Sequence, residues 1–396
     1  MIPTPLPLSV APRPPDYRDG CLVNLMASIV AARGGRPDYP TLSLLPRLEL
    51  ARATNLILLA IDGLGDDWLA RRSPDGLLRQ HRLGAIDSVF PSTTATAITT
   101  YLTGDAPRRH GLTGWYTWMS ELGAVMTVLP GTPRYGGVPY RKAGIDPVRL
   151  FGHRPVFERI GTRSLIVSPN RIARSDFNIA HAGSAKVLPF DGLADLFRQL
   201  GRALRRDRVP KFLYAYWPDL DSIGHRDGME SDAAVQHLRL IEQALADFLV
   251  AAAGTDTVLL VCADHGQVDT VPDDLIDLSQ HPELESCLAL PLCGEPRAAF
   301  AYLRSGRESD FLDYCRGPLA GQVEVHPSRA LKEAGWFGFG PEHPRFDERI
   351  GDWCILPIGN RIIRQWLPFE ERRHLIGQHG GLSEAELRVP LCLFKL

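Results

Sequence analysis

The sequence has 396 residues, of which 44% are hydrophobic and 23% charged, a composition typical of a globular protein with a large core. Its formal net charge of −2 argues against a nucleic-acid polymer or an anionic membrane surface as partner. Residues 1–15 are proline-rich without a secretory signal, and no apolar run could span a bilayer, so we expect a cytoplasmic protein. The seven cysteines are scattered without a C-x-x-C pair, which indicates neither a disulfide framework nor a zinc knuckle.

Continuous apolar runs recur along the chain and predict strands that are buried on both faces. The first run is Asn55–Ile61, which follows a lead containing one apolar helix near Leu22–Ala32. The later strands are expected at 164–167, 212–216 and 257–262, and amphipathic helices at 192–204 and 232–252. This alternation predicts an α/β fold with a doubly wound, mainly parallel central sheet and helices on both faces.

The alternation of long strands and helices stops from about residue 271 to 372, where Pro, Gly and Trp are more frequent. Short strands are expected in this segment at 298–303 and 322–326. We interpret residues 288–350 as a small α+β insertion. The catalytic core would then comprise 53–287 and 351–396. Residues 1–52 would form a Pro-rich lead that packs on this core.

The stretch from Phe90 to Gly104 predicts a strand end, a tight turn and a short helix that Gly104 closes. Hydroxyl side chains stand where this helix begins, at Ser92, Thr93 and Thr94. They could simply cap the helix. They could also place an oxygen beside free N–H groups and the positive end of the helix dipole, where phosphate binds well. Alone, the run favours the cap; the rest of the chain favours the second interpretation.

Aspartates and histidines follow the predicted strands and stand beside glycines in three further segments. Asp62 ends the first strand, at the edge where open α/β sheets bind their ligands. The segments are Asp221-Ser222-Ile223-Gly224-His225, Asp264-His265-Gly266 and Gln378-His379-Gly380. Each one alone could be a helix cap or an ordinary polar residue. Together, carboxylates and imidazoles suit zinc or another borderline divalent ion, and pairs of such ions recur in phosphoryl displacement.

In their order along the chain, these motifs resemble the type I phosphodiesterase/nucleotide pyrophosphatase family of the alkaline phosphatase superfamily. The resemblance runs from about residue 54 to the C-terminus. It rests on Asp62-Gly63, Phe90-Pro91-Ser92-Thr93-Thr94, Thr103-Gly104 with His110-Gly111, Asp221-x-x-Gly224-His225, Asp264-His265-Gly266 and His379-Gly380.

The resemblance implies an alkaline-phosphatase-like fold that hydrolyses phosphodiester or nucleotide pyrophosphate bonds in a small phosphate-ester or nucleotide-like substrate. It implies Thr94 as the nucleophile, with Thr93 as its neighbouring alternative, and a phosphothreonine intermediate. It also implies two divalent metal ions, with Zn²⁺ expected. One ion would be held by Asp62, Thr94, Asp264 and His265, and the other by Asp221, His225 and His379.

Other activities remain open within the same fold. A phosphomonoesterase or a hydrolase of the C–P bond in phosphonates is the nearest alternative, and a non-catalytic binding module is a further one. A monoesterase needs a cation for its dianionic phosphoryl group. The sequence singles out none of its candidates, which are Arg108, Arg109, Arg141, Arg171 and Arg372.

The sequence departs from the family at one position. Family members carry an Asn shortly after the His-Gly pair, where it donates a hydrogen bond to a phosphoryl oxygen. Counting forward, this position falls on Trp115, whose indole N–H can donate one hydrogen bond but not in the way an amide does. Trp115 and Tyr116 are expected either to line a substrate pocket or to form a plain core cluster.

Overall fold

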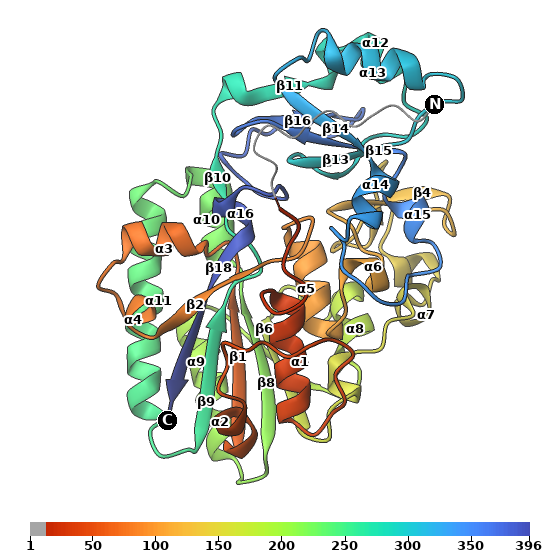
Figure 1. Cartoon of the computed structure of the whole chain (residues 1–396). Coiled ribbons are helices and arrows are strands. Elements are labelled where there is room, and N and C mark those ends of the chain that lie inside the picture. Colours follow the sequence, from red (N-terminus) through yellow and green to blue (C-terminus); the bar gives the residue numbers. More distant parts are fainter. Residues whose placement is uncertain (1–12) are drawn as a thin grey trace.

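The computed structural model describes residues 13–396 and is built around a seven-stranded sheet, sheet A, with helices on both of its faces (Figure 1). Its central strand, β1, is buried along its whole length, as its apolar sequence predicts. The strands of sheet A, in spatial order, are β2 Arg82–Asp87, β18 Arg388–Lys395, β9 Thr257–Cys262, β1 Asn55–Ile61, β8 Lys211–Trp217, β6 Arg163–Pro169 and β7 Lys186–Phe190.

Sheet A is mainly parallel. Strand β1 pairs in parallel with β8 and β9, and β6 pairs in parallel with β7 and β8. Strand β18 is the exception, because it runs antiparallel between β2 and β9. The predicted doubly wound fold with a mainly parallel central sheet is therefore confirmed.

Helices α9 and α11 have apolar residues at helical spacing on one face, whereas α1 and α5 are buried on nearly all sides. Helices α1 and α5 cover one face of sheet A, whereas α9 and α11 cover the other (Figure 1). The α-helices are α1 Leu22–Ala32, α2 Arg47–Arg52, α3 Asp66–Arg72, α4 Leu77–Gln80, α5 Thr94–Thr103, α6 Pro107–His110, α7 Pro147–Phe151, α8 Asp176–Ala182, α9 Leu193–Arg205, α10 Asp219–Asp227, α11 Asp232–Ala251, α12 Pro282–Ser286, α13 Glu308–Arg316, α14 Ser328–Glu333, α15 Phe346–Arg349 and α16 Glu384–Leu387.

A second seven-stranded sheet, sheet B, is antiparallel throughout. In spatial order its strands are β14 Val323–Pro327, β15 Trp353–Pro357, β13 Ala298–Ala301, β12 Cys293–Glu295, β3 Tyr116–Met119, β4 Ala124–Thr127 and β5 Thr132–Pro133. The expected insertion at 288–350 thus shares its sheet with residues 116–133 and 353–357. How the chain divides into domains stays a prediction.

Two short strand pairs connect the sheets. Strand β10 (Val268–Asp269) pairs with β17 (Gly377–Gln378), and β11 (Leu275–Asp277) pairs with β16 (Ile362–Arg364). Through these pairs, residues 268–277, which follow β9, are hydrogen-bonded to residues 362–378, which precede β18. Helix α1 joins the main hydrophobic core, and residues 1–12 of the expected lead lie outside the described residues.

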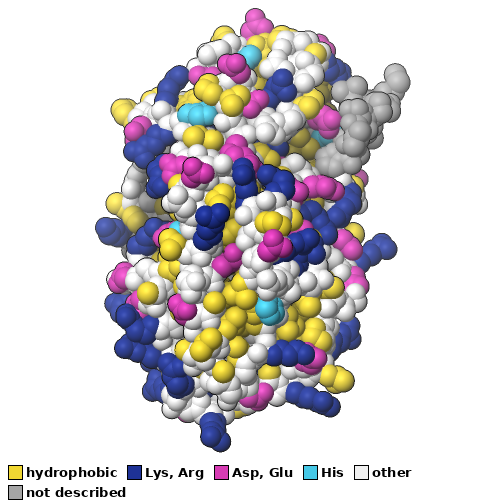
Figure 2. Space-filling view, turned by 90° about the vertical axis from the view of Figure 1, so that its left-hand side faces the viewer, with side chains coloured by type: hydrophobic (Ala, Val, Ile, Leu, Met, Phe, Trp, Pro, Cys, Tyr) yellow, Lys and Arg dark blue, Asp and Glu magenta, His cyan; other side chains and the backbone are white. Residues whose placement is uncertain are grey.

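The near-neutral net charge of the chain is reflected on its surface. The face drawn in Figure 2 mixes acidic and basic side chains along its whole length. All seven cysteines are buried free thiols. In the described part of the chain, no helix is both long and apolar enough to cross a membrane.

Candidate active site

Parallel pairing brings the predicted site residues to one edge of sheet A. Asp62 directly follows β1, Asp264 follows β9, and Asp221 lies in α10, just after β8. Because these three strands are parallel neighbours, their carboxyl ends meet. His379 arrives from the other end of the chain, since β17 pairs with β10 beside the Asp264 loop.

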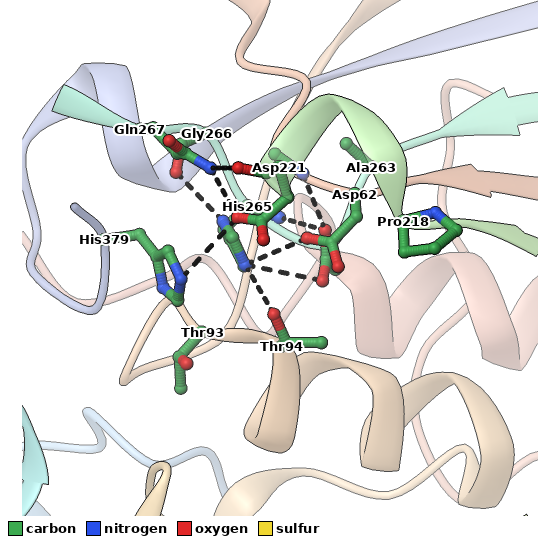
Figure 3. Close-up of polar contacts among 12 residues, drawn as sticks. Asp62, Thr93, Thr94, Pro218, Asp221, Ala263, His265, Gly266, Gln267 and His379 are labelled. Carbon is green, nitrogen blue, oxygen red and sulfur yellow. Dashed lines mark hydrogen bonds and ion pairs between the residues drawn. The ribbon is translucent and has the colours of Figure 1, made fainter. Parts of the chain in front are cut away.

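Thr94 is the first residue of α5, and its Oγ1 lies 3.0 Å from His265 Nε2 (Figure 3). Helix α5 ends as predicted, with Gly104 in the left-handed conformation at φ 73°. The capping position is Thr93, but no side-chain hydrogen bond caps the helix. The Thr93 hydroxyl instead donates to Glu295 Oε1 at 2.6 Å. The hydroxyls at this helix start therefore do not serve as simple caps.

His265 lies at the centre of the cluster of acidic side chains. Its Nε2 is 3.3 Å from Asp62 Oδ1 and 3.5 Å from Asp264 Oδ2 (Figure 3). These three residues form one group whose potential ligand atoms lie within 4.8 Å of one another. Asp62, Thr94, Asp264 and His265 are thus brought together, as the first predicted ligand set requires.

The second predicted set lies beside the first. Asp221 Oδ1 is 3.4 Å from His225 Nε2 and 3.8 Å from His379 Nε2. Asp221 and His379 also form a compact group with His265, whose ring stacks on that of His379 at 3.8 Å between centroids. His265 therefore adjoins both sets, and the division of the ligands between two ions stays a prediction.

The donor chemistry of this cluster fits cations. The Nδ1 atoms of His265 and His225 lie 3.0 Å and 2.7 Å from the carbonyl oxygens of Gly266 and Gly377. A carbonyl can only accept, so Nδ1 carries the proton and a neutral ring turns its Nε2 lone pair toward the carboxylates. Within residues 13–396, Asp62 Oδ1 and Asp264 Oδ2 are buried without a hydrogen-bond partner. Lone pairs and carboxylate oxygens facing one another are stable when a cation lies between them.

The carboxyl groups hold protons unusually strongly in the metal-free protein. Burial and the neighbouring Asp264 and Asp221 carboxylates raise the pKa of Asp62 well above its ordinary value. Burial and the Asp221 charge raise the pKa of Asp264 to about 7. A divalent ion must displace these protons in order to bind.

We expect zinc to stabilise the protein more at pH 7.5 than at pH 5.5. A raised carboxyl pKa means that the folded, metal-free chain binds more protons than the unfolded chain, so it loses stability as pH rises from about 4 to about 7. Zinc removes this loss by replacing the protons. Thermal unfolding with and without zinc would show the difference in Tm growing between the two pH values. An Asp264→Asn variant should show less growth, and a pH-independent difference in Tm would contradict the expectation.

Several supporting residues were not predicted. The Tyr216 hydroxyl donates to Asp62 Oδ2, and Gln267 Nε2 donates to Asp221 Oδ1. Glu295 accepts from both Thr93 Oγ1 and the Trp115 backbone N–H, each at 2.6 Å. Tyr216 and Gln267 stand next to recognised motifs, so their position was a usable signal. Glu295 lies far away in the sequence and offered none.

A cavity of about 860 Å³ opens beside Thr94, between the carboxyl edge of sheet A and sheet B. Trp115 and Tyr116 both line it, and 37% of Trp115 is exposed. The Arg134 guanidinium lies over the Tyr116 ring, 3.9 Å from the ring centroid, in a cation–π contact. Both aromatic residues are therefore placed where a substrate could meet them, although their role in binding stays a prediction.

The five arginines considered for a dianionic phosphoryl group all form ion pairs. Only Arg171 among them lines the cavity. Its side chain is 60% exposed and lies 3.7 Å from Asp219. The other pairs are Arg108–Glu342, Arg109–Asp38, Arg141–Asp176 and Arg372–Asp277.

Comparison with solved structures finds the same fold in hydrolases. Murine ectonucleotide pyrophosphatase/phosphodiesterase 5 (ENPP5) superposes with a TM-score of 0.65 at 15% identity, covering 85% of this chain and 87% of that one. An inactive variant of the murine protein, in complex with AMP, gives 0.65 at 14% over the same shares. Phosphonoacetate hydrolase from Sinorhizobium meliloti 1021, in complex with phosphonoformate, gives 0.59 at 17%, covering 85% and 89%.

The sequence itself identifies the family. No curated protein matches the chain. Residues 56–306, more than half of the chain, match the family described as type I phosphodiesterase / nucleotide pyrophosphatase. The match includes all of β1 but its first residue, the start of α5 and the Asp264-His265-Gly266 segment. The chain therefore belongs to the type I phosphodiesterase/nucleotide pyrophosphatase family, a family of metal-dependent hydrolases in the alkaline phosphatase superfamily.

Proposed function

We propose that the protein hydrolyses phosphodiester or nucleotide pyrophosphate bonds, with Thr94 as the nucleophile and two divalent metal ions as cofactors. One observation carries the proposal. The Thr94 hydroxyl stands at a helix N-terminus, 3.0 Å from His265 Nε2, next to three buried aspartates at the carboxyl edge of the sheet.

Thr94 is oriented for attack by its surroundings. The His265 Nδ1–H points at Gly266 O, so in the chain without metal its Nε2 lone pair accepts a hydrogen bond from the Thr94 hydroxyl and orients Oγ1. The same lone pair would bind the first ion, beside which the Thr94 hydroxyl would lose its proton more readily. The unpaired N–H groups in the first turn of α5 favour a phosphoryl group at this place. Attack by Oγ1 on phosphorus forms a phosphothreonine as the bond to the leaving oxygen breaks, and water then hydrolyses the phosphothreonine.

The residues that would hold the ions are Asp62, Thr94, Asp264 and His265 for one ion, and Asp221, His225 and His379 for the other. Once bound, divalent ions supply Lewis-acid stabilisation for the attacking and leaving oxygens. The chain supports these ligands from outside. Tyr216 and Gln267 donate to the carboxylates of Asp62 and Asp221 and fix their orientation. Zinc is the expected ion because imidazole and carboxylate ligands suit it.

We expect zinc-loaded protein to hydrolyse bis-p-nitrophenyl phosphate faster than p-nitrophenyl phosphate. The monoester is a dianion, and four of the five arginines considered for such a charge point into ion pairs away from the cavity. Initial rates on both substrates, before and after removal of the metal by a chelator, test this. A monoester preference would make the protein a phosphomonoesterase, and unchanged rates without metal would contradict the metal-dependent mechanism.

Hydrolysis of a phosphonate is the second candidate. The similarity to phosphonoacetate hydrolase extends over 85% of the chain. In addition, Trp115 is expected at the position of the family Asn, and its backbone N–H is already bound to Glu295. If the count holds, the chain lacks the amide with which nucleotide-cleaving relatives hold a phosphoryl oxygen. Zinc-loaded protein that cleaves neither p-nitrophenyl ester but releases phosphate from a phosphonate would favour this candidate.

A further inference from the structure

We propose that Arg364 binds a second anionic group of the substrate, a carboxylate or a phosphate separate from the phosphoryl group that reacts. This inference rests on the proposed function, because it assumes that the reacting phosphoryl group lies at Thr94. It narrows the substrate class to phosphate esters or phosphonates that carry a further negative charge.

Arg364 is held on a fixed piece of backbone at the wall of the active-site cavity. It ends β16, where it pairs with Asp277 of β11, and the preceding Ile363 N–H donates to Pro296 O at 2.9 Å. Its side chain lines the cavity that Thr94 and His379 also line. Arg364 therefore faces the substrate space from the side of the cavity where Pro296 adjoins sheet B.

The guanidinium has no partner of its own. Across residues 13–396, the Arg364 Nε atom is buried without a hydrogen-bond partner, and no carboxylate forms an ion pair with this side chain. Burial lowers its pKa. Arg364 is half-buried, and a cation in such a place without a counter-ion is costly, so such groups are normally paired in the functional state. An anion that enters the cavity would provide this pairing.

The nearby charges cannot take this role because they are already engaged. Glu370 pairs with Arg134 at 2.8 Å. The Glu295 Oε1 atom accepts two hydrogen bonds. Burial raises the pKa of Glu295 to about 7, although the Thr93 and Trp115 donors and the Arg364 charge lower it. Both carboxylates are thus engaged by other groups, and within residues 13–396 neither forms an ion pair with Arg364.

The position of Arg364 favours a second group over the reacting one. Arg364 follows Ile363, whose N–H donates to Pro296 O beside β12 of sheet B, whereas Asp62, Asp221 and Asp264 lie at the carboxyl edge of sheet A. The cavity of about 860 Å³ is lined both by Asp62 and Asp221 and by Arg364, so it has room for a substrate with a group beyond the reacting one. A guanidinium can bind a carboxylate or a phosphate through two parallel hydrogen bonds.

The test measures binding of matched anions to the zinc-loaded protein by calorimetry. One pair is butylphosphonate and 4-phosphonobutyrate, which differ by a carboxylate. The other pair is ethylphosphonate and methylenediphosphonate, which differ by a second phosphonate. In each pair the doubly functional probe should bind more tightly. Whichever pair shows the larger difference identifies the second group as carboxylate-like or phosphate-like.

The Arg364→Met variant keeps the length of the side chain and removes its charge. It should weaken binding of the doubly functional probes by about 10- to 100-fold, the range of a charged hydrogen-bonded contact. Binding of butylphosphonate and ethylphosphonate should not change. Arg364→Lys should retain part of the preference. Arg171→Met is the matched control, because it removes an exposed arginine of the same cavity.

Equal weakening of all four probes by Arg364→Met would overturn the inference, since Arg364 would then bind the reacting group or only hold the wall. An equal loss of preference in Arg171→Met would also overturn it, because the effect would be a general positive field. Failure of the proposed function looks different. In that case the p-nitrophenyl diester would not turn over, while the probes would still depend on Arg364.

Discussion

Replacement of Thr94 by alanine should reduce turnover of bis-p-nitrophenyl phosphate by at least ~1,000-fold, because loss of a nucleophile removes the covalent route. Metal content should stay nearly unchanged, since Asp62, Asp264 and His265 remain within reach of one another. Initial rates and the metal content of the same preparation, by elemental analysis, would measure both. The fold should survive, because the Thr94 hydroxyl makes its hydrogen bond to His265 alone.

Two variants make this experiment specific. Thr94→Ser keeps a hydroxyl and should recover a substantial part of the activity. Thr93→Ala removes only the hydrogen bond to Glu295 and should cause a much smaller loss than Thr94→Ala. Full activity in Thr94→Ala would show that Thr93 or water attacks phosphorus.

Replacement of His379 by alanine should lower both metal content and activity. His379 lies 3.8 Å from Asp221 Oδ1 and stacks on His265, so it can reach an ion held by either neighbour. Substitution of a residue that hydrogen-bonds to a metal ligand typically lowers metal affinity or activity by about 10- to 100-fold. Substitution of a direct ligand should lower them by at least as much. We therefore expect a loss of at least ~100-fold in rate, with bound zinc falling from two ions per chain toward one.

His374 provides the matched control, because this histidine is exposed and lies in the same segment five residues earlier. His374→Ala should keep both metal and activity. Excess zinc should partly restore the rate of His379→Ala but not that of Thr94→Ala. A His379→Ala protein that keeps two tightly bound ions would remove His379 from the ligand set.

The central sheet was predictable because its strands are buried on both faces. Such strands read as uninterrupted apolar runs, and Asn55–Ile61 and Thr257–Cys262 were predicted to the residue. The aspartates could be placed for a related reason. Parallel strands bring their carboxyl ends together, so an acidic residue after each strand predicts a cluster without any knowledge of the loops.

The wall of the cavity could not be predicted in the same way. Glu295 and Arg364 belong to short strands whose partners lie far away in the sequence, and a charged residue in such a strand resembles an exposed one. Only the pairing of β12 with β3 shows that Glu295 meets Trp115. Sheet B likewise joins residues 116–133 to 293–357. The local sequence pattern of these strands does not show that they pair with one another.

The place of β18 affects how the protein can be made. This strand, the last along the chain, lies inside sheet A between β2 and β9 and does not lie at an edge. While a ribosome has yet to release residues 388–395, β9 exposes a row of unpaired backbone groups, and nascent chains in this state are prone to pair with one another. A chain that lacks β18 should therefore need more chaperone assistance, and be lost more readily to aggregation, than the chain with this strand in place.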